Sequence, residues 1–188
     1  MKSAKKILVV ALLLSTLAAV RRRDPLTDAE SDQLREVATE PGPRMKLYIK
    51  FAEARLSSID QLRSDPKAAA GRGKKIHDLL EDFTAILDEI NDNLDTYEGR
   101  PLNKEDKKQF HKSLREAMEA DGRFDAKLKA LKGAEDDRQT QKEALDYQFV
   151  LQDAMEALKS SSSMVREYLN SRPEEADRKK PEEADRKK

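Results

Sequence analysis

The sequence lacks cysteine, and this absence excludes several kinds of site. None of its 188 residues carries a thiol, so the chain forms no disulfide, binds no metal through thiolates and has no cysteine for lipid attachment. Tryptophan is absent too, and only two histidines are present. A chain of this length can still fold by burying apolar side chains alone.

β-branched residues are scarce, which argues against a sheet. From Asp24 onward the chain holds three valines, five isoleucines and five threonines, against 17 leucines and 18 alanines. Charged residues make up 39% of the chain and hydrophobic residues 37%, a ratio that suits helices with one apolar stripe each. Because strong helix formers dominate, we predict an all-α fold.

Proline and glycine are few and fall mainly outside the segments of helical periodicity. We expect a helical domain over residues 24–172. Its helices are predicted at about 27–39, 44–64, 74–98, 103–132 and 135–170. The short connections favour an antiparallel four-helix up-down bundle with a short extra N-terminal helix, for which Thr27 and Glu30 form a capping box. A run of serines, Ser160 to Ser163, predicts a bend or break in the last helix.

Charge suggests how two of these helices pair. Residues 76–99 hold eight acids and neither lysine nor arginine, whereas residues 100–132 hold ten basic and six acidic residues. Folded as a hairpin, the third and fourth helices would bring these opposite charges together. We therefore expect these two helices to be neighbours.

The long apolar run at the N-terminus predicts a signal peptide over residues 1–20. Three lysines precede a 14-residue run of apolar and small residues at 7–20, and Ala18 ends a plausible cleavage motif. The run is shorter than the roughly 20 residues of an ordinary membrane-spanning helix. Arg21 to Arg23 follow at once, and such charge resists translocation, so a short N-terminal anchor is the alternative.

The formal net charge of zero hides a mildly acidic mature chain. Cleavage after Ala18 removes three lysines and no acid, which leaves 34 basic residues against 37 acidic ones, a net charge of −3. Nucleic-acid binding depends on neutralising phosphates with a basic patch. A nucleic-acid partner is therefore not expected.

No motif in the sequence indicates catalysis or cofactor binding. His77 and His111 both fall at the margin of their helices' apolar stripes, where a boundary or surface histidine is expected. The Glu-x-x-His pattern of di-iron bundles does not occur, nor does a glycine-rich phosphate loop. We assign no catalytic, cofactor-binding or metal-binding residues.

Two charges stand on apolar faces. Asp121 falls within the apolar stripe of the fourth helix, and Arg55 lies on the apolar side of the second. A buried charge requires a partner. We therefore hypothesise that Arg55 and Asp121 form a buried ion pair.

Apolar side chains away from the main stripes indicate a second candidate site. Leu145 and Phe149 point away from the stripe of the fifth helix, and the second helix is apolar over more than half of its circumference. The candidate interaction surface consists of Leu47, Phe51, Leu145 and Phe149.

The C-terminus is a tandem duplication of one octapeptide, at 173–180 and again at 181–188. Apart from proline it has no apolar residue larger than alanine. Such a segment has nothing to bury, so we expect a disordered charged tail.

These features favour a non-enzymatic interaction or structural module of the cell envelope, exported to the periplasm or beyond, whose partner is another envelope protein. The alternative is a protein of the membrane surface, tethered by an uncleaved residue 7–20 segment, whose amphipathic helices open onto lipid. An enzyme that uses a carboxylate or His111 ranks third. The sequence identifies neither the partner nor the oligomeric state.

Mass spectrometry of the N-terminus of the purified chain tests the leader. If the signal peptide is cleaved as predicted, the first residue is Ala19. An intact residue 7–20 segment in the purified protein would favour the anchor.

Overall fold

The described part of the protein is all-helical. The computed structural model describes residues 24–133 and 141–172, so the predicted leader and tail lie outside the described residues. No strand occurs in these two ranges. The elements in chain order are α2 (Asp28–Glu36), α3 (Pro41–Ser64), the 3₁₀ turn η1 (Pro66–Ala68), α4 (Arg72–Glu98), α5 (Lys104–Gly133), α6 (Gln141–Ala144) and α7 (Gln148–Ser171).

Helix ends follow local signals in the sequence. The predicted capping box is present at α2, where the Glu30 amide donates to Thr27 Oγ1 and the Thr27 amide donates to the Glu30 carboxylate. Prolines occupy the first turn of α3, where their missing N–H costs nothing. Asn103 accepts from the Asp106 amide at 2.9 Å and so caps α5.

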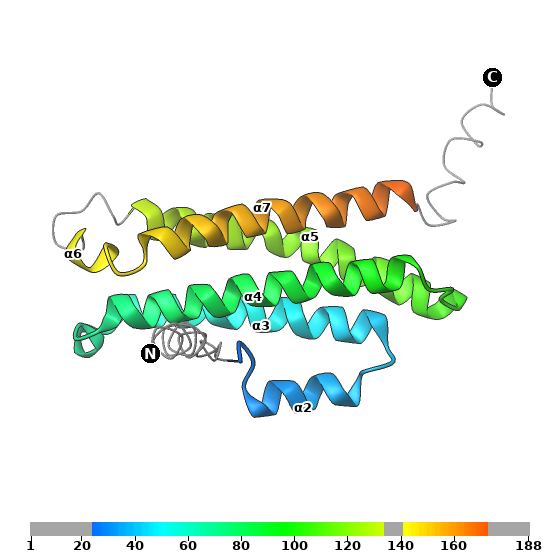
Figure 1. Ribbon diagram of the computed structural model, residues 1–188, viewed down its shortest axis with the longest axis horizontal. Helices are drawn as coiled ribbons and strands as arrows, with labels where there is room; N and C mark the ends of the chain where they lie inside the picture. Colours follow the sequence, from blue (N-terminus) through cyan, green and yellow to red (C-terminus); the bar gives the residue numbers. More distant parts are fainter. Residues whose placement is uncertain (1–23, 134–140, 173–188) are drawn as a thin grey trace, which may run out of the picture.

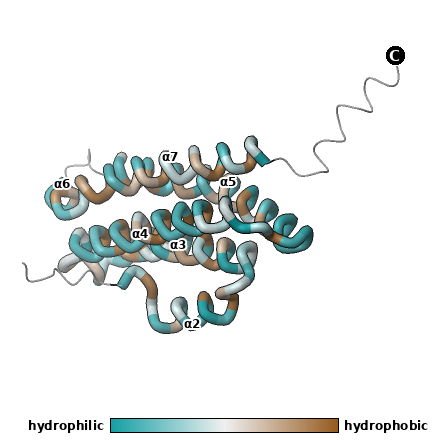
Figure 2. The backbone as a smooth tube through the Cα atoms, turned by 45° about the vertical axis from the view of Figure 1, so that its right-hand side comes forward, coloured by the Kyte–Doolittle hydropathy of each residue, from teal (hydrophilic) through white to brown (hydrophobic). Residues whose placement is uncertain are grey.

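The four long helices pack in a closed ring. The adjacent pairs are α3 with α4, α4 with α7, α7 with α5, and α5 with α3. Successive long helices run in opposite directions along the molecule, as Figure 1 shows. Hydrophobic and hydrophilic residues alternate along each of them, as expected for helices that bury one face (Figure 2).

The expected pairing of the third and fourth helices is wrong. These helices, α4 and α5, lie diagonally across the core, and α5 packs beside α3 instead, running in the same direction. Basic residues of α5 pair with acids of α3: Arg123 Nε lies 3.2 Å from Glu53 Oε1, and Lys127 contacts Asp60. Two cations of α5 thus pair with acids of α3, a helix other than the one expected.

Aromatic rings join the diagonal helices at the centre of the core. Phe83 of α4 and Phe124 of α5 meet edge to face, with ring centroids 5.6 Å apart. Phe110 of α5 contacts both Tyr97 and Tyr168 in the same manner, at 5.3 and 5.5 Å. Such geometry adds about 0.5–1.5 kcal/mol per pair to the burial itself. Large side chains therefore fill the space between α4 and α5.

The last predicted helix is interrupted, but not at its serines. The break lies between α6 and α7, at Leu145 to Tyr147, whereas α7 is continuous through the serine run. Ser163 Oγ donates to the Lys159 carbonyl within the same helix, and Ser162 Oγ donates to Asp121. The break expected at the serines therefore does not form, because α7 is helical throughout them.

None of the helices in the described residues is long and apolar enough to cross a membrane.

Two glycines allow a matched test of this packing. A Cβ added at Gly42 would lie 2.9 Å from the Gln109 backbone carbon, whereas one added at Gly122, midway along α5, meets nothing within 4 Å. We expect Gly42→Ala to lower the free energy of unfolding by about 1–3 kcal/mol through overpacking. Gly122→Ala should raise it by about 1 kcal/mol through helix propensity. Urea denaturation measures both; equal effects would contradict the close α3–α5 contact.

Candidate functional site

The most exposed large apolar side chains of the described residues lie where α6 meets α7. Leu145 is 62% exposed and Phe149 is 73% exposed. They stand four residues apart across the turn that separates the two helices. We call these two residues and the turn between them the α6–α7 corner; it lies at the left end of the molecule in Figure 1.

Buried neighbours hold this corner in place. Ala144, which precedes the turn, is 3% exposed, and Tyr147, the last residue of the turn, is 2% exposed. The amides of Asp146 and Tyr147 donate to the carbonyls of Glu143 and Ala144, each at 3.1 Å. The turn therefore directs Ala144 and Tyr147 into the core and leaves Leu145 and Phe149 outside.

The start of α4 fixes α6 from the other side. Arg72 Nε donates to both carboxylate oxygens of Glu143, at 3.0 and 2.9 Å, and the two side chains are each 17% exposed. Gly73 permits this contact, because a Cβ there would lie 2.7 Å from the Glu143 carbonyl oxygen. The sequence reasoning missed these residues, although Arg72 gave a signal: a cation in a first helical turn opposes the helix dipole and needs a partner.

A groove of about 190 Å³ opens beside Phe149. Leu151 and Met155 of α7 supply its apolar lining, and Lys132 closes it from the end of α5. Phe149 thus stands next to a concave, partly apolar surface. An apolar side chain beside such a groove is the arrangement that protein-binding sites use for their central contacts.

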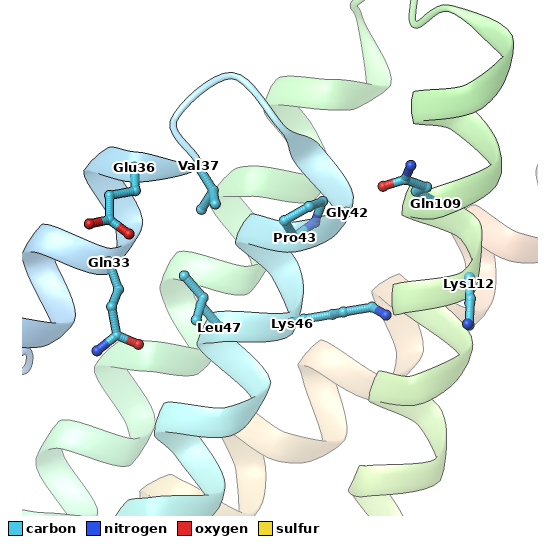
Figure 3. Close-up of a pocket in the computed structure, with 9 residues that line it drawn as sticks. All are labelled: Gln33, Glu36, Val37, Gly42, Pro43, Lys46, Leu47, Gln109 and Lys112. Atoms are coloured by element: carbon cyan, nitrogen blue, oxygen red, sulfur yellow. The ribbon is translucent and has the colours of Figure 1, made fainter.

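A larger cavity, of about 510 Å³, lies at the opposite end of the molecule (Figure 3). It is open between the end of α2 and the first turns of α3 and α5. The lining residues include Gln33, Glu36, Val37, Pro43, Lys46, Leu47, Gln109 and Lys112. Its polar groups are of mixed charge, and Lys46 is already paired with Glu116 at 3.1 Å.

The predicted interaction surface does not exist as a single surface. Leu145 and Phe149 are exposed as expected, but Phe51 is only 2% exposed and belongs to the core. Leu47 is partly buried and lines the larger cavity instead (Figure 3). The reason is that α3 has a third neighbour, α2, which covers the side of α3 expected to be free.

The predicted Arg55–Asp121 ion pair is also wrong. Arg55 is 8% exposed and donates to both carboxylate oxygens of Glu30, at 2.8 and 2.6 Å, with Asp82 Oδ2 3.4 Å from its Nε. Asp121 instead accepts from Ser162 Oγ at 2.7 Å. Both charges are partly or wholly buried and both have partners, but the partners come from α2, α4 and α7.

The ionisation of these groups follows from their surroundings. Burial would raise the pKa of Glu30, but hydrogen bonds from Arg55 and from the Thr27 amide, together with the charge of Arg55, outweigh it and lower the pKa. Burial raises the pKa of Asp121, and the Ser162 hydrogen bond and the charge of Arg166 offset only part of that effect.

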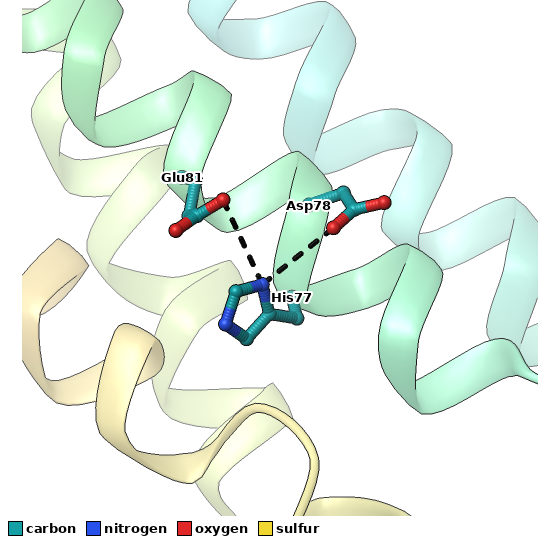
Figure 4. Close-up of side chains that lie close together, drawn as sticks. All are labelled: His77, Asp78 and Glu81. Carbon is teal, nitrogen blue, oxygen red and sulfur yellow. Dashed lines mark ion pairs between the residues drawn. The ribbon is translucent and has the colours of Figure 1, made fainter. Parts of the chain in front are cut away.

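The two histidines differ in burial. His77 is partly exposed, as expected, and its Nδ1 lies 3.6 Å from Asp78 Oδ1 and 3.8 Å from Glu81 Oε2 (Figure 4). These three side chains could offer ligand atoms to a metal, but they follow one another on a single helix, and Glu81 is exposed. We read them as a solvated face of α4.

His111 was expected at the core margin but is buried, at 1% exposed. Its ring centroid lies 5.8 Å from that of Tyr168. The physical reason is that α5 packs against both α3 and α7, so its buried face is wider than one apolar stripe.

The raised pKa of Asp121 predicts how stability depends on pH. A carboxyl whose folded-state pKa is raised favours folding while protonated, and this contribution is lost as pH rises through the folded-state pKa. We expect Asp121→Asn to be more stable than the wild type at neutral pH, with the difference vanishing near about pH 3. Thermal unfolding across pH measures this. Asp125→Asn, on the surface of the same helix, removes the same charge and should give no such gain; equal gains would refute the role of burial.

No protein-family model matches the chain, and neither a curated protein nor a solved structure gives a match.

Proposed function

We propose that this chain is a non-enzymatic interaction module of the cell envelope, exported across the membrane, which binds another envelope protein through the α6–α7 corner. The observation that carries the proposal is the exposure of Leu145 and Phe149, at 62% and 73%, on a backbone held from both sides. Exposed apolar side chains on a rigid support lose little conformational entropy when a partner covers them.

The frame for this site is taken to be an antiparallel four-helix bundle with α2 as an additional helix. The Phe83–Phe124 contact joins α4 to α5, and the Arg72–Glu143 ion pair joins the start of α4 to α6, beside the corner. A binding site on such a frame needs no conformational change to form. The groove beside Phe149 gives the partner a place for an apolar side chain of its own.

The chemistry of the site fits binding better than catalysis. Leu145 and Phe149 carry no reactive group, and the carboxylate of Glu143 beside the corner is engaged by Arg72. Within the described residues, the His77 group is the clearest cluster of titratable side chains near this end, and it lies on a solvated face. Neither arrangement provides a base next to a nucleophile.

Substitution at the corner tests the proposal. We expect Leu145→Ser with Phe149→Ser to weaken partner binding by about tenfold or more, because apolar anchors of this size carry much of an interface's energy. The free energy of unfolding should change by less than about 0.5 kcal/mol, because both side chains are exposed. Met118→Ser is the matched control, since Met118 is the other large exposed apolar residue in the described part of the chain, at 36%.

The measurement is crosslinking in intact cells from a photoreactive residue at position 149, with the same residue at the exposed Glu119 as reference. A defined adduct from position 149, whose protein partner then binds the purified chain but not the double variant, supports the proposal. If instead the corner binds anionic phospholipid vesicles and gives no protein adduct, the membrane-surface alternative is correct.

A further inference from the structure

The wide apolar face of α3 is covered by α2. Leu47, Phe51 and Arg55 lie four residues apart on α3 and so follow one another along one face. Leu47 lines the larger cavity together with Val37, and Arg55 hydrogen-bonds to residues in and before α2. Phe51 lies between them and is 2% exposed. We call this face, with Asp82 of α4 at its edge, the α2 groove.

Two arginines of α3 fasten α2 at its ends. Near the start of α2, Arg55 donates to Glu30 and to the Pro25 carbonyl, the latter at 2.6 Å. At the far end, Arg44 donates to the Leu34 carbonyl at 3.4 Å. The side chain of Leu34 is the buried apolar side chain of α2, at 5% exposed. The attachment is thus largely polar, with a single buried apolar anchor.

A helix of nine residues has little stability of its own. Isolated helices shorter than about 12–15 residues are marginal in water, so α2 owes its helicity to the groove. Pro41 and Pro43 at the start of α3 prevent α2 and α3 from merging into one continuous helix. α2 can therefore leave its place without unwinding α3.

The groove left behind would have a defined chemical preference. Arg55 would keep Asp82, 3.4 Å away, but would lose the two-oxygen contact with Glu30. A buried guanidinium favours a carboxylate in that place. Phe51 and Leu47 would be uncovered beside it. An occupant therefore needs a carboxylate and, one turn later, an apolar side chain.

We propose that α2 is a built-in, removable cover of a helix-binding groove on α3, and that an amphipathic helix of a partner protein takes its place. That helix carries a carboxylate four residues before a leucine, as Glu30 precedes Leu34. In the closed chain α2 blocks the site. The α2 groove is distinct from the α6–α7 corner, and its existence does not depend on binding at the corner.

Charge reversal in the full chain tests the proposal. Glu30→Lys places a cation against Arg55 and removes the capping glutamate, so α2 should detach. The probe is a labelled synthetic peptide of residues 24–38. We expect it to bind the Glu30→Lys chain at least about tenfold more tightly than the wild type, whose own α2 occupies the groove nearly all of the time. A peptide that itself carries Glu30→Lys should not bind.

Asp32→Lys is the matched control, because Asp32 lies on the exposed side of α2, where it pairs with Arg35. This variant makes the same charge change and should bind the peptide no better than the wild type. Hydrogen exchange should show faster exchange of α2 in Glu30→Lys while the long helices stay protected. If that variant fails to fold, Leu34→Ser opens α2 by removing its apolar anchor instead.

Three results would overturn the proposal. One is equal peptide binding by the wild type and the opened variants. Another is binding that does not depend on the glutamate of the peptide. The third is a wild-type dimer at high concentration that Glu30→Lys abolishes, which would assign the groove to α2 of a second copy.

Discussion

Burial of α3 on three sides is the constraint on which the rest of the structure depends. α3 packs against α4, α5 and α2, and its apolar residues cover more than half of its circumference. Two long neighbours leave one side uncovered, and a four-helix ring offers no third. The short helix α2 supplies it, held by Arg55 and Arg44. In the closed chain the extra N-terminal helix therefore covers the side of α3 that its long neighbours leave open.

Much of the fold was predictable because helical signals are local. The all-α class, the capping box at Thr27 and the helix start at Asn103 all follow from residues close in sequence. The order of helices around the core was not, because every long helix is amphipathic and periodicity does not identify its neighbour. Charge was a poor guide here, because two cations of α5, Arg123 and Lys127, pair with Glu53 and Asp60 of α3 instead.

The candidate site was predictable in part, and for a related reason. Leu145 and Phe149 depart from the apolar stripe of the predicted fifth helix, and that departure is visible in the sequence. In the structure Phe149 is exposed on α7 and Leu145 in the turn before it. Phe51 also lies outside the main apolar stripe of its helix. It is buried nonetheless, because α3 has a third neighbour, α2, whose position was not predicted from the sequence. Arg55 and Asp121 were recognised as misplaced charges, yet their partners, Glu30 and Ser162, come from helices whose positions were unknown.

The two proposed surfaces differ in what binding requires of the chain. At the α6–α7 corner the Arg72–Glu143 contact and the buried Tyr147 already fix the backbone, so affinity is set by the new contacts alone. At the α2 groove a ligand must first displace Glu30 and Leu34, and its apparent affinity is its intrinsic affinity multiplied by the fraction of chains that are open. The corner is therefore always available, whereas occupancy of the groove rises with anything that loosens α2. Binding at the groove is the step that the chain itself can regulate.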